Sequence, residues 1–271
     1  MKKSFGQHLL IDKNHLKKII NNVDLSQEDI VLEIGAGSGL LTCELAKKVN
    51  KVFAVELERE IIEKLKRNLK LSQIENVEII QSDFLKLYLK SISKKPFKVL
   101  GNIPYNITSQ ILIKLFGEID SPAPHLDLLS EVYLMLQLEV AKRVVASYGT
   151  KAYSPLTLLV QYFTNPEILY KVPKTAFFPI PRVDSALVKF HVKKKPQELE
   201  NPTLLKNIIR TSFQQRRKKI INSLTAFIDD KALITNTLKK INLNCDLRPE
   251  DLNFNQYVEI SNAFSQLQAF V

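Results

Sequence analysis

Short runs of apolar residues, many of them β-branched, alternate with longer amphipathic stretches from residue 30 onward. The runs of strand length are residues 30–34, 51–55, 77–80, 97–100 and 132–136. Residues 40–49 and 59–71 have helical spacing, and another helix is expected to follow the fifth strand to about Ser147. This alternation predicts right-handed βαβ units and an α/β fold with a mostly parallel sheet covered on both faces.

Two further strands complete a sheet of seven. Residues 167–172 follow a proline, and residues 186–192 alternate apolar and polar side chains, as in a half-buried antiparallel strand. Beyond Lys193 the pattern changes to helices without a convincing strand. We therefore expect an α/β domain over residues 1–196 and a small all-α domain over residues 197–271.

The charge of the chain indicates a class of binding partner. The 271 residues carry a formal net charge of +11, which favours a polyanionic partner. Residues 193–219 hold nine lysines and arginines against two glutamates. Within this stretch Arg216, Arg217, Lys218 and Lys219 are consecutive, so they form a candidate phosphate-binding patch, with a solvated helix face as the alternative.

Other compositional features exclude several classes of protein. No apolar run approaches the roughly 20 residues of a membrane span, and the polar N-terminus does not indicate a signal peptide. Cys43 and Cys245 have neither CxxC spacing nor clustered histidines, so we expect no metal site and no disulfide framework. Two scattered cysteines fit a reducing compartment, which predicts a cytoplasmic protein.

A glycine-rich turn lies between the first strand and its helix. It contains Gly35, Gly37 and Gly39, with the spacing GxGxG rather than the GxGxxG of dinucleotide folds. Glu56 ends the second strand, where it could accept both ribose hydroxyls, and Asp83 follows the third, where it could bind the adenine amino group. The set favours S-adenosylmethionine. NAD binding and a purely structural turn remain the alternatives.

The sequence Asn102-Ile103-Pro104-Tyr105 ends the fourth strand. An amine conjugated to an adenine ring is a poor nucleophile, and the Asn102 amide oxygen together with a backbone carbonyl could accept its two hydrogens. Pro104 would stiffen the loop, and Tyr105 could stack on the base. Because the methyl donor is already activated, alignment and desolvation would supply the catalysis. The alternative is a simple turn.

A proline-rich segment, residues 177–185, precedes the last strand. It could be a packed crossover. It could equally form an aromatic wall for an extruded base, with Phe178 against the base and Arg182 near the RNA backbone.

These motifs, together with Phe5-Gly6-Gln7-His8-Leu9-Leu10, resemble those of the ribosomal RNA small-subunit (16S) adenine dimethyltransferase family, the RsmA/KsgA type, from about Lys3 to Arg248. The family usually has Phe where Leu9 stands. We expect the protein to act as a monomer, and the resemblance implies a Rossmann-like class I methyltransferase that uses S-adenosylmethionine. It also implies a role in small-subunit biogenesis.

The resemblance also assigns residues. Gln7, His8 and Leu10 would line the donor pocket, Gly35 and Gly37 would contact the donor, and Asn102 would contact both donor and target amine. The implied reaction is four methyl transfers, two to each of two adjacent adenosines in the 3′-terminal hairpin loop of 16S rRNA, each adenine leaving its stack. The C-terminal helices would bind the RNA or the immature subunit.

Three alternatives remain at this point. One is the large-subunit (23S) rRNA adenine methylase of the macrolide-resistance type, which shares the core motifs. Another is a non-catalytic RNA-binding or ribosome-assembly protein, which retention of Glu56, Asp83 and the Asn102–Tyr105 sequence disfavours. The third is an NAD-dependent oxidoreductase, which the glycine spacing disfavours.

Overall fold

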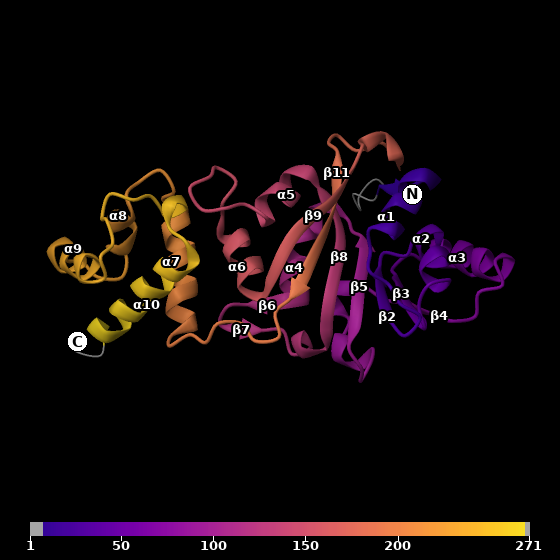
Figure 1. Cartoon of the computed structure of the whole chain (residues 1–271), viewed down its shortest axis with the longest axis horizontal. Coiled ribbons are helices and arrows are strands. Elements are labelled where there is room, and N and C mark those ends of the chain that lie inside the picture. Colours follow the sequence, from indigo (N-terminus) through magenta and orange to yellow (C-terminus); the bar gives the residue numbers. More distant parts are fainter. Residues whose placement is uncertain (1–7, 269–271) are drawn as a thin grey trace. The chain divides into compact units, whose positions relative to one another are not determined.

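The computed structural model describes residues 8–268 and divides them into two compact units (Figure 1). The first unit comprises residues 8–117, 123–142 and 164–194. The second comprises residues 118–122 and 143–163 and the chain from residue 195. This division differs from the expected boundary near residue 197, because two segments from the middle of the chain contribute to the second core.

A seven-stranded sheet forms the centre of the first unit. Its order is β4 (Val77–Gln81), β3 (Lys51–Glu56), β2 (Ile30–Ile34), β5 (Phe97–Asn102), β8 (Leu129–Gln137), β11 (Ser185–Val192) and β9 (Thr164–Val172). Strand β11 is antiparallel to both of its neighbours, and the other neighbouring pairs are parallel. The predicted α/β fold with a mostly parallel seven-stranded sheet is confirmed.

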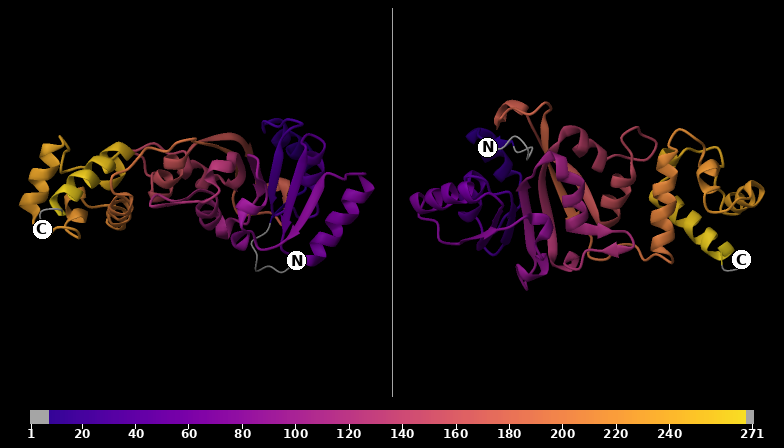
Figure 2. Two further views of the ribbon diagram at one scale, coloured as in Figure 1. Left: turned by 90° about the horizontal axis from the view of Figure 1, so that it is seen from below. Right: turned by 180° about the vertical axis from the view of Figure 1, so that it is seen from behind.

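Both faces of the sheet are covered. Helices α1 (Lys13–Asn21), α2 (Leu40–Ala46) and α3 (Arg59–Leu71) lie along the part of the sheet formed by β2, β3 and β4 (Figures 1 and 2). Successive residues of a strand point to opposite faces, and Tyr133 of β8 belongs to the same core as these helices. Helix α4 (Thr108–Phe116) packs on the other face, where the ring of Phe116 meets that of Phe190 at 5.7 Å between centroids.

Strand β11 differs from its prediction. Its first four residues are all buried, so it is not half-buried. The reason is its place between β8 and β9 under helices on both sides, where an alternating pattern gives way to continuous burial. Helix α4 was not predicted, since its sequence is apolar on most sides and periodicity alone does not separate such a helix from a strand.

Short elements surround the sheet. Strand β1 (Leu9–Leu10) pairs with β10 (Phe177–Phe178) in a separate two-stranded sheet, and β6 (Gly117–Glu118) pairs with β7 (Ser121–Pro122). Helix α5 (Leu138–Val144) follows β8, and a single 3-10 turn, η4 (Tyr105–Ile107), follows β5.

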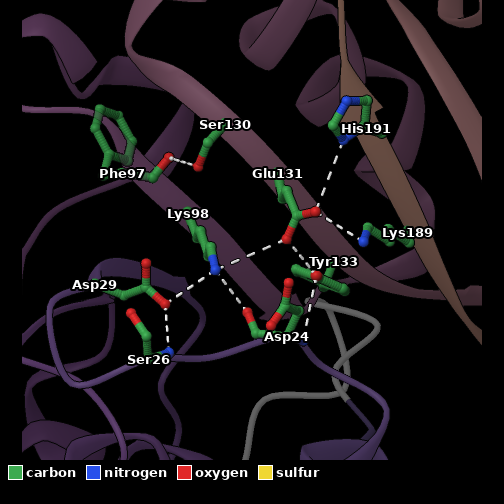
Figure 3. A network of polar contacts seen from close by, with 10 residues as sticks. All are labelled: Asp24, Ser26, Asp29, Phe97, Lys98, Ser130, Glu131, Tyr133, Lys189 and His191. Carbon is green, nitrogen blue, oxygen red and sulfur yellow. Dashed lines mark hydrogen bonds and ion pairs between the residues drawn. The ribbon is translucent and has the colours of Figure 1, made fainter.

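A buried polar network joins the strands at the end of the sheet where β5 and β8 begin (Figure 3). The Glu131 carboxylate accepts from Tyr133 at 2.5 Å and pairs with Lys189 at 2.7 Å. Lys98 pairs with Asp29 at 2.9 Å and donates to the main-chain carbonyl of Asp24 at 2.7 Å. The network therefore connects β5, β8 and β11 to the loop before β2, away from the carboxyl ends of the parallel strands.

The second unit is largely helical. It contains α6 (Pro155–Phe163), α7 (Pro202–Gln214), α8 (Ile220–Leu224), α9 (Lys231–Lys240) and α10 (Phe254–Gln268). Its core includes Leu158, Leu205, Ile208, Tyr257 and Phe264. Helix α6 belongs to this core because its apolar side chains pack there, although it lies between β8 and β9 in sequence.

Candidate functional site

The glycine-rich turn between β2 and α2 has the conformation its sequence predicts. Gly35, Gly37 and Gly39 all have positive φ angles, of 72°, 57° and 91°, a region that other L-residues rarely adopt. The turn is held by hydrogen bonds from the Gly35 and Ala36 amides to the Val55 carbonyl, at 2.9 and 3.1 Å. The glycine-rich turn is therefore attached to the carboxyl ends of β2 and β3.

Glu56, at the end of β3, is buried and fully oriented by main-chain amides. One carboxylate oxygen accepts from Gly37 at 2.9 Å, and the other accepts from Leu57 at 2.7 Å and Glu58 at 3.1 Å. Three of its roughly four acceptor positions are therefore engaged. In this structure Glu56 anchors the glycine turn, a structural role in addition to the expected contact with ribose.

Asp83 lies on the neighbouring strand end. The register pairs Glu56 of β3 with Gln81 of β4, and Asp83 follows two residues later as the cap of a 3-10 turn. One oxygen of its carboxylate accepts from the Leu85 amide at 2.9 Å. The two expected nucleoside-binding acids thus stand at adjacent strand ends.

A cavity lies between the glycine turn, the ends of β2 and β5, and the segment that contains β1. It encloses about 40 Å³, and its lining includes Leu9, Leu10, Glu33, Gly35, Gly37 and Asn102. Four expected site residues, Leu10, Gly35, Gly37 and Asn102, therefore meet at one cavity. Glu56 and Asp83 lie outside its lining, although Glu56 is bonded to Gly37.

Glu33 lines the same cavity and was not assigned a role from the sequence. Its side chain is buried, and one carboxylate oxygen has no hydrogen-bond partner. Burial raises the pKa of Glu33 to about 8; the Thr42 side chain opposes this rise and the negative charge of Glu56 adds to it. A buried, unpartnered acid is costly unless it meets a cation. Its position inside an otherwise apolar strand was the available signal.

Asn102 ends β5 with its side chain oriented by the N-terminal segment. Its amide nitrogen donates to the main-chain carbonyl of His8 at 2.7 Å. This bond orients the amide group, whose oxygen is its hydrogen-bond acceptor and can accept a hydrogen from a ligand. His8 therefore contacts Asn102 through its main-chain carbonyl. Gln7, which was expected to line the donor pocket, lies outside the described residues.

Pro104 and Tyr105 continue into the 3-10 turn. The Pro104 carbonyl accepts from the Ile107 amide at 3.3 Å. The hydroxyl of Tyr105 is 2.5 Å from that of Ser185, and its ring stacks on the His8 imidazole with 5.5 Å between centroids. Burial raises the pKa of Tyr105, so this phenol stays neutral. One ring face of Tyr105 is therefore covered by His8.

The residues expected to contact RNA separate into two groups. In the first unit, Phe178 and Arg182 are both exposed. In the second unit, Arg216 is ion-paired with Glu250 and donates to the Lys151 carbonyl at 2.5 Å, and Lys219 pairs with Asp246 at 2.7 Å. Arg217 and Lys218 are exposed, so half of the predicted patch is engaged in contacts within its own unit.

Across residues 8–268 no group of three or more His, Cys, Asp or Glu side chains could hold a metal ion. No helix in that range is long and apolar enough to cross a membrane.

Comparisons with known proteins agree with this geometry. The chain is 38% identical to ribosomal RNA small subunit methyltransferase A of Caldanaerobacter subterraneus over 268 residues, covering 97% of this chain and 96% of the relative. It is 39% identical to the protein of that name from Crocosphaera subtropica, covering 98% of each. Among solved structures, a dimethyladenosine transferase from Plasmodium falciparum matches 96% of this chain and 98% of its own, with a TM-score of 0.77 and 26% identity.

The sheet order, the glycine turn and the Asn102 sequence at the end of β5 define the class as a Rossmann-like methyltransferase. The family model for "Ribosomal RNA adenine dimethylase" matches residues 1–266. The chain therefore belongs to the ribosomal RNA adenine dimethylase family, and the resemblance inferred from the motifs is confirmed.

Proposed function

We propose that this protein transfers methyl groups from S-adenosylmethionine to the N6 amines of two adjacent adenosines in the 3′-terminal hairpin loop of 16S rRNA. The observation that supports it most directly is Asn102, whose amide nitrogen is held by the His8 carbonyl at the edge of the cavity. The curated relatives with the highest identities cited above are small-subunit enzymes by name.

The residues around the cavity fit the donor. The positive-φ glycines bring backbone close to a ligand, and the unpartnered oxygen of Glu33 suits a positively charged group. When bound, the donor supplies an activated methyl group on a sulfonium. We assign Glu33 to the cationic part of the donor, Glu56 to the ribose and Asp83 to the adenine.

Asn102 acts on the target amine. Its side-chain oxygen accepts one N6 hydrogen, which draws the nitrogen lone pair out of conjugation and directs it at the methyl carbon. A monomethylated amine keeps one hydrogen, so the same oxygen can serve a second transfer. Tyr105 stacks on the base with the ring face not covered by His8, or after His8 moves.

The donor is larger than the cavity beside Asn102. A space of about 40 Å³ holds a few waters and not a nucleoside. The wall containing Leu9 and Leu10 is attached to β10 by two residue pairs, fewer than any strand of the main sheet. We therefore expect this segment to shift when the donor binds.

The remaining assignments concern partners. The first unit would supply catalysis, and the helical second unit would bind 16S rRNA within the immature small subunit. In the helical part, the exposed cations Arg217 and Lys218 are the better candidates for phosphate contacts, since Arg216 and Lys219 already have carboxylate partners. The protein would act as a monomer in the cytoplasm.

One assay tests the proposal. Undermethylated small subunits are incubated with the protein and radiolabelled S-adenosylmethionine, and the modified nucleotides are mapped. We expect label on two adjacent adenosines near the 3′ end of 16S rRNA, and at least a 100-fold slower transfer with Asn102→Ala while donor affinity falls only in part. Label confined to large-subunit rRNA, or near-normal turnover of the variant, would contradict the proposal.

A further inference from the structure

A second hollow lies in the first unit, next to the site. It has a volume of about 400 Å³ and is lined by Leu138, Glu139, Lys142, Lys174, Arg182, Val183 and Asp184. We call it the α5 groove, because one wall is the start of helix α5 and the other is the segment around Lys174 and the proline-rich residues before β11.

Three exposed cations, Lys142, Lys174 and Arg182, line the α5 groove. Two acids, Glu139 and Asp184, also line it and are exposed as well. Asp184 has a structural task, because its carboxylate accepts from the Lys174 amide and its carbonyl from the Leu138 amide, both at 2.9 Å. The bond from Leu138 joins the two walls, and the bond from Lys174 lies within the second wall.

Exposed apolar side chains continue the groove along the same segment. Phe178, Ile180 and Val183 are 61%, 60% and 41% exposed. Large apolar side chains in such numbers are uncommon on a free surface and indicate an interaction site. Cations that follow a backbone, next to an aromatic ring on which a base can stack, are the features that proteins use to bind single-stranded nucleic acid.

The α5 groove also begins where the target base must lie. Asp184 immediately precedes Ser185, whose hydroxyl is 2.5 Å from that of Tyr105. We propose that the α5 groove binds the phosphate backbone of the single-stranded RNA next to the flipped adenosine, through Lys142, Lys174 and Arg182. This inference rests on the proposed function and adds two phosphate-binding residues, Lys142 and Lys174, to it.

The test compares two triple variants of equal charge. One is Lys142→Ala/Lys174→Ala/Arg182→Ala in the groove. The control is Lys48→Ala/Lys64→Ala/Lys70→Ala, which removes one exposed cation after helix α2 and two on helix α3. Binding to undermethylated small subunits and to a ten-nucleotide uridine RNA is measured from 50 to 300 mM salt, with donor affinity and methyl transfer alongside.

We expect the groove variant to lose about 0.7 in the slope of log affinity against log salt for each phosphate contact, about 2 in all. Its KM for small subunits should rise at least tenfold, with kcat and donor affinity unchanged. Equal slopes for the two variants would overturn the inference, and so would weaker binding to subunits with unchanged binding to the RNA, because that pattern indicates a protein partner. Failure of the proposed function is distinct, since wild-type protein would then label no 16S rRNA.

An independent observation concerns Ser185. It is fully buried at the start of β11 and is paired on either side with Gln137 and Val172. Its position is therefore fixed by two neighbouring strands. Its hydroxyl holds that of Tyr105 at 2.5 Å across 80 residues of sequence.

The proline-rich segment reaches Tyr105 by a second route. The Pro179 carbonyl is 2.6 Å from the Nδ1 atom of His8, and the His8 ring stacks on Tyr105. We infer that Ser185 is a positioning residue, which fixes the Tyr105 ring against the target base from the sheet side while His8 supports it from the other. This too rests on the proposed function.

A double-mutant cycle tests this role with Ser185→Ala, Tyr105→Phe and the pair. Both single changes remove the same hydrogen bond and keep the ring, so each should lower kcat about tenfold, and the pair should be no slower than either. Donor affinity should be unchanged, and the ratio of monomethylated to dimethylated adenosine should rise.

Two results would overturn the inference. One is additive losses of kcat. The other is a Ser185→Ala protein that melts at a lower temperature but has normal kcat and a normal product ratio, because a merely structural serine would affect stability alone. Tyr105→Phe keeps the test decisive if Ser185→Ala does not fold.

Discussion

At the scale of single residues, the site combines strained, buried and charged groups that a stable core would avoid. Glu33 lies in the middle of a buried strand with one oxygen unpartnered. Its raised pKa, about 8 in the folded protein against an ordinary 4.5, has burial as its main cause. The folded chain therefore retains a proton that the unfolded chain has lost over that pH interval, so Glu33 reduces stability as pH rises from 4.5 to 8.

Glu33→Gln should remove this pH dependence. We expect the free energy of unfolding of the variant to exceed that of wild type by an amount that grows by at most about 1.4 kcal/mol per pH unit between pH 4.5 and 8. Donor affinity at pH 8.5 should fall about tenfold, which corresponds to about 1.4 kcal/mol. Urea denaturation and calorimetric titration measure the two effects. Glu44→Gln, on the surface of α2, is the control and should change neither.

Gly101 is required for a different reason. Its φ is not in the left-handed region, but a Cβ there would lie 2.9 Å from the Ile34 carbonyl oxygen and 3.0 Å from the Ile34 Cβ on the paired strand. Gly101→Ala should therefore cost about 2 kcal/mol by overpacking and should shift Asn102, slowing methyl transfer. Gly149→Ala, at a positive φ in open space, should cost about 1 kcal/mol without slowing it. Equal kinetic effects would contradict the steric explanation.

At the scale of elements, the network around Glu131 fixes the strands at the end of the sheet away from the site (Figure 3). Burial tends to raise the pKa of Glu131, but Lys189 and Tyr133 oppose this, and the net shift is downward. The stabilisation is therefore present above the ordinary pKa of 4.5 and is lost as pH falls below it. Because β5 ends at Asn102 and β11 begins at Ser185, the network holds two of the strands that position the site.

Glu131→Gln should destabilise the protein by about 3 kcal/mol at pH 7, since Lys189 at 2.7 Å and Lys98 at 3.9 Å both lose a negatively charged partner. The difference from wild type should shrink as pH falls below 4.5, which denaturation curves at pH 7, 5 and 4 can measure. Glu78→Gln breaks the exposed pair with Lys51 and should cost less than about 1 kcal/mol. A Glu131 variant as stable as the Glu78 variant would show that the network contributes little.

At the scale of the whole molecule, the chain builds two cores whose segments interleave in sequence. The second core includes residues 118–122 and 143–163 as well as the chain from residue 195. A C-terminal fragment cut at residue 197 would lack the α6 residues, such as Leu158, that complete its core. RNA contacts and structural contacts must therefore be separated in the full chain, residue by residue.

Substitutions of Arg216 and Arg217 can separate structural contacts from RNA contacts. Arg216→Ala removes the ion pair with Glu250 and the bond to the Lys151 carbonyl, so we expect faster hydrogen exchange in residues 143–163 and 202–214. Arg217→Ala should leave exchange unchanged and should reduce the salt slope of RNA binding by about 0.7. The opposite pattern, with Arg216 affecting only RNA binding, would show that its carboxylate partner is readily exchanged for phosphate.

The local pattern of apolar and polar residues was sufficient to predict many elements of this protein. Residues 30–34 and 59–71 form the predicted strand and helix with the predicted bounds, because a period of two or 3.6 residues is a property of neighbours in sequence. The positive-φ glycines and the family motifs are also local. The amphipathic helices could be predicted because their apolar residues recur with the helical period. Helices α4 and α6 are apolar on most sides and could not be predicted in this way.

Contacts between distant segments decided the rest. The orientation of the Asn102 amide depends on His8, and that of Tyr105 on Ser185, across 94 and 80 residues. The burial of both faces of β11 and the interleaved cores likewise depend on which segments pack together. The sequence by itself determined which residue types stand at the strand ends, whereas only the tertiary structure determined which atoms of those residues remain available to a ligand. The reason is that a hydrogen-bonding group pairs with the group that the fold brings close to it. The sequence does not specify which distant segments will lie close together.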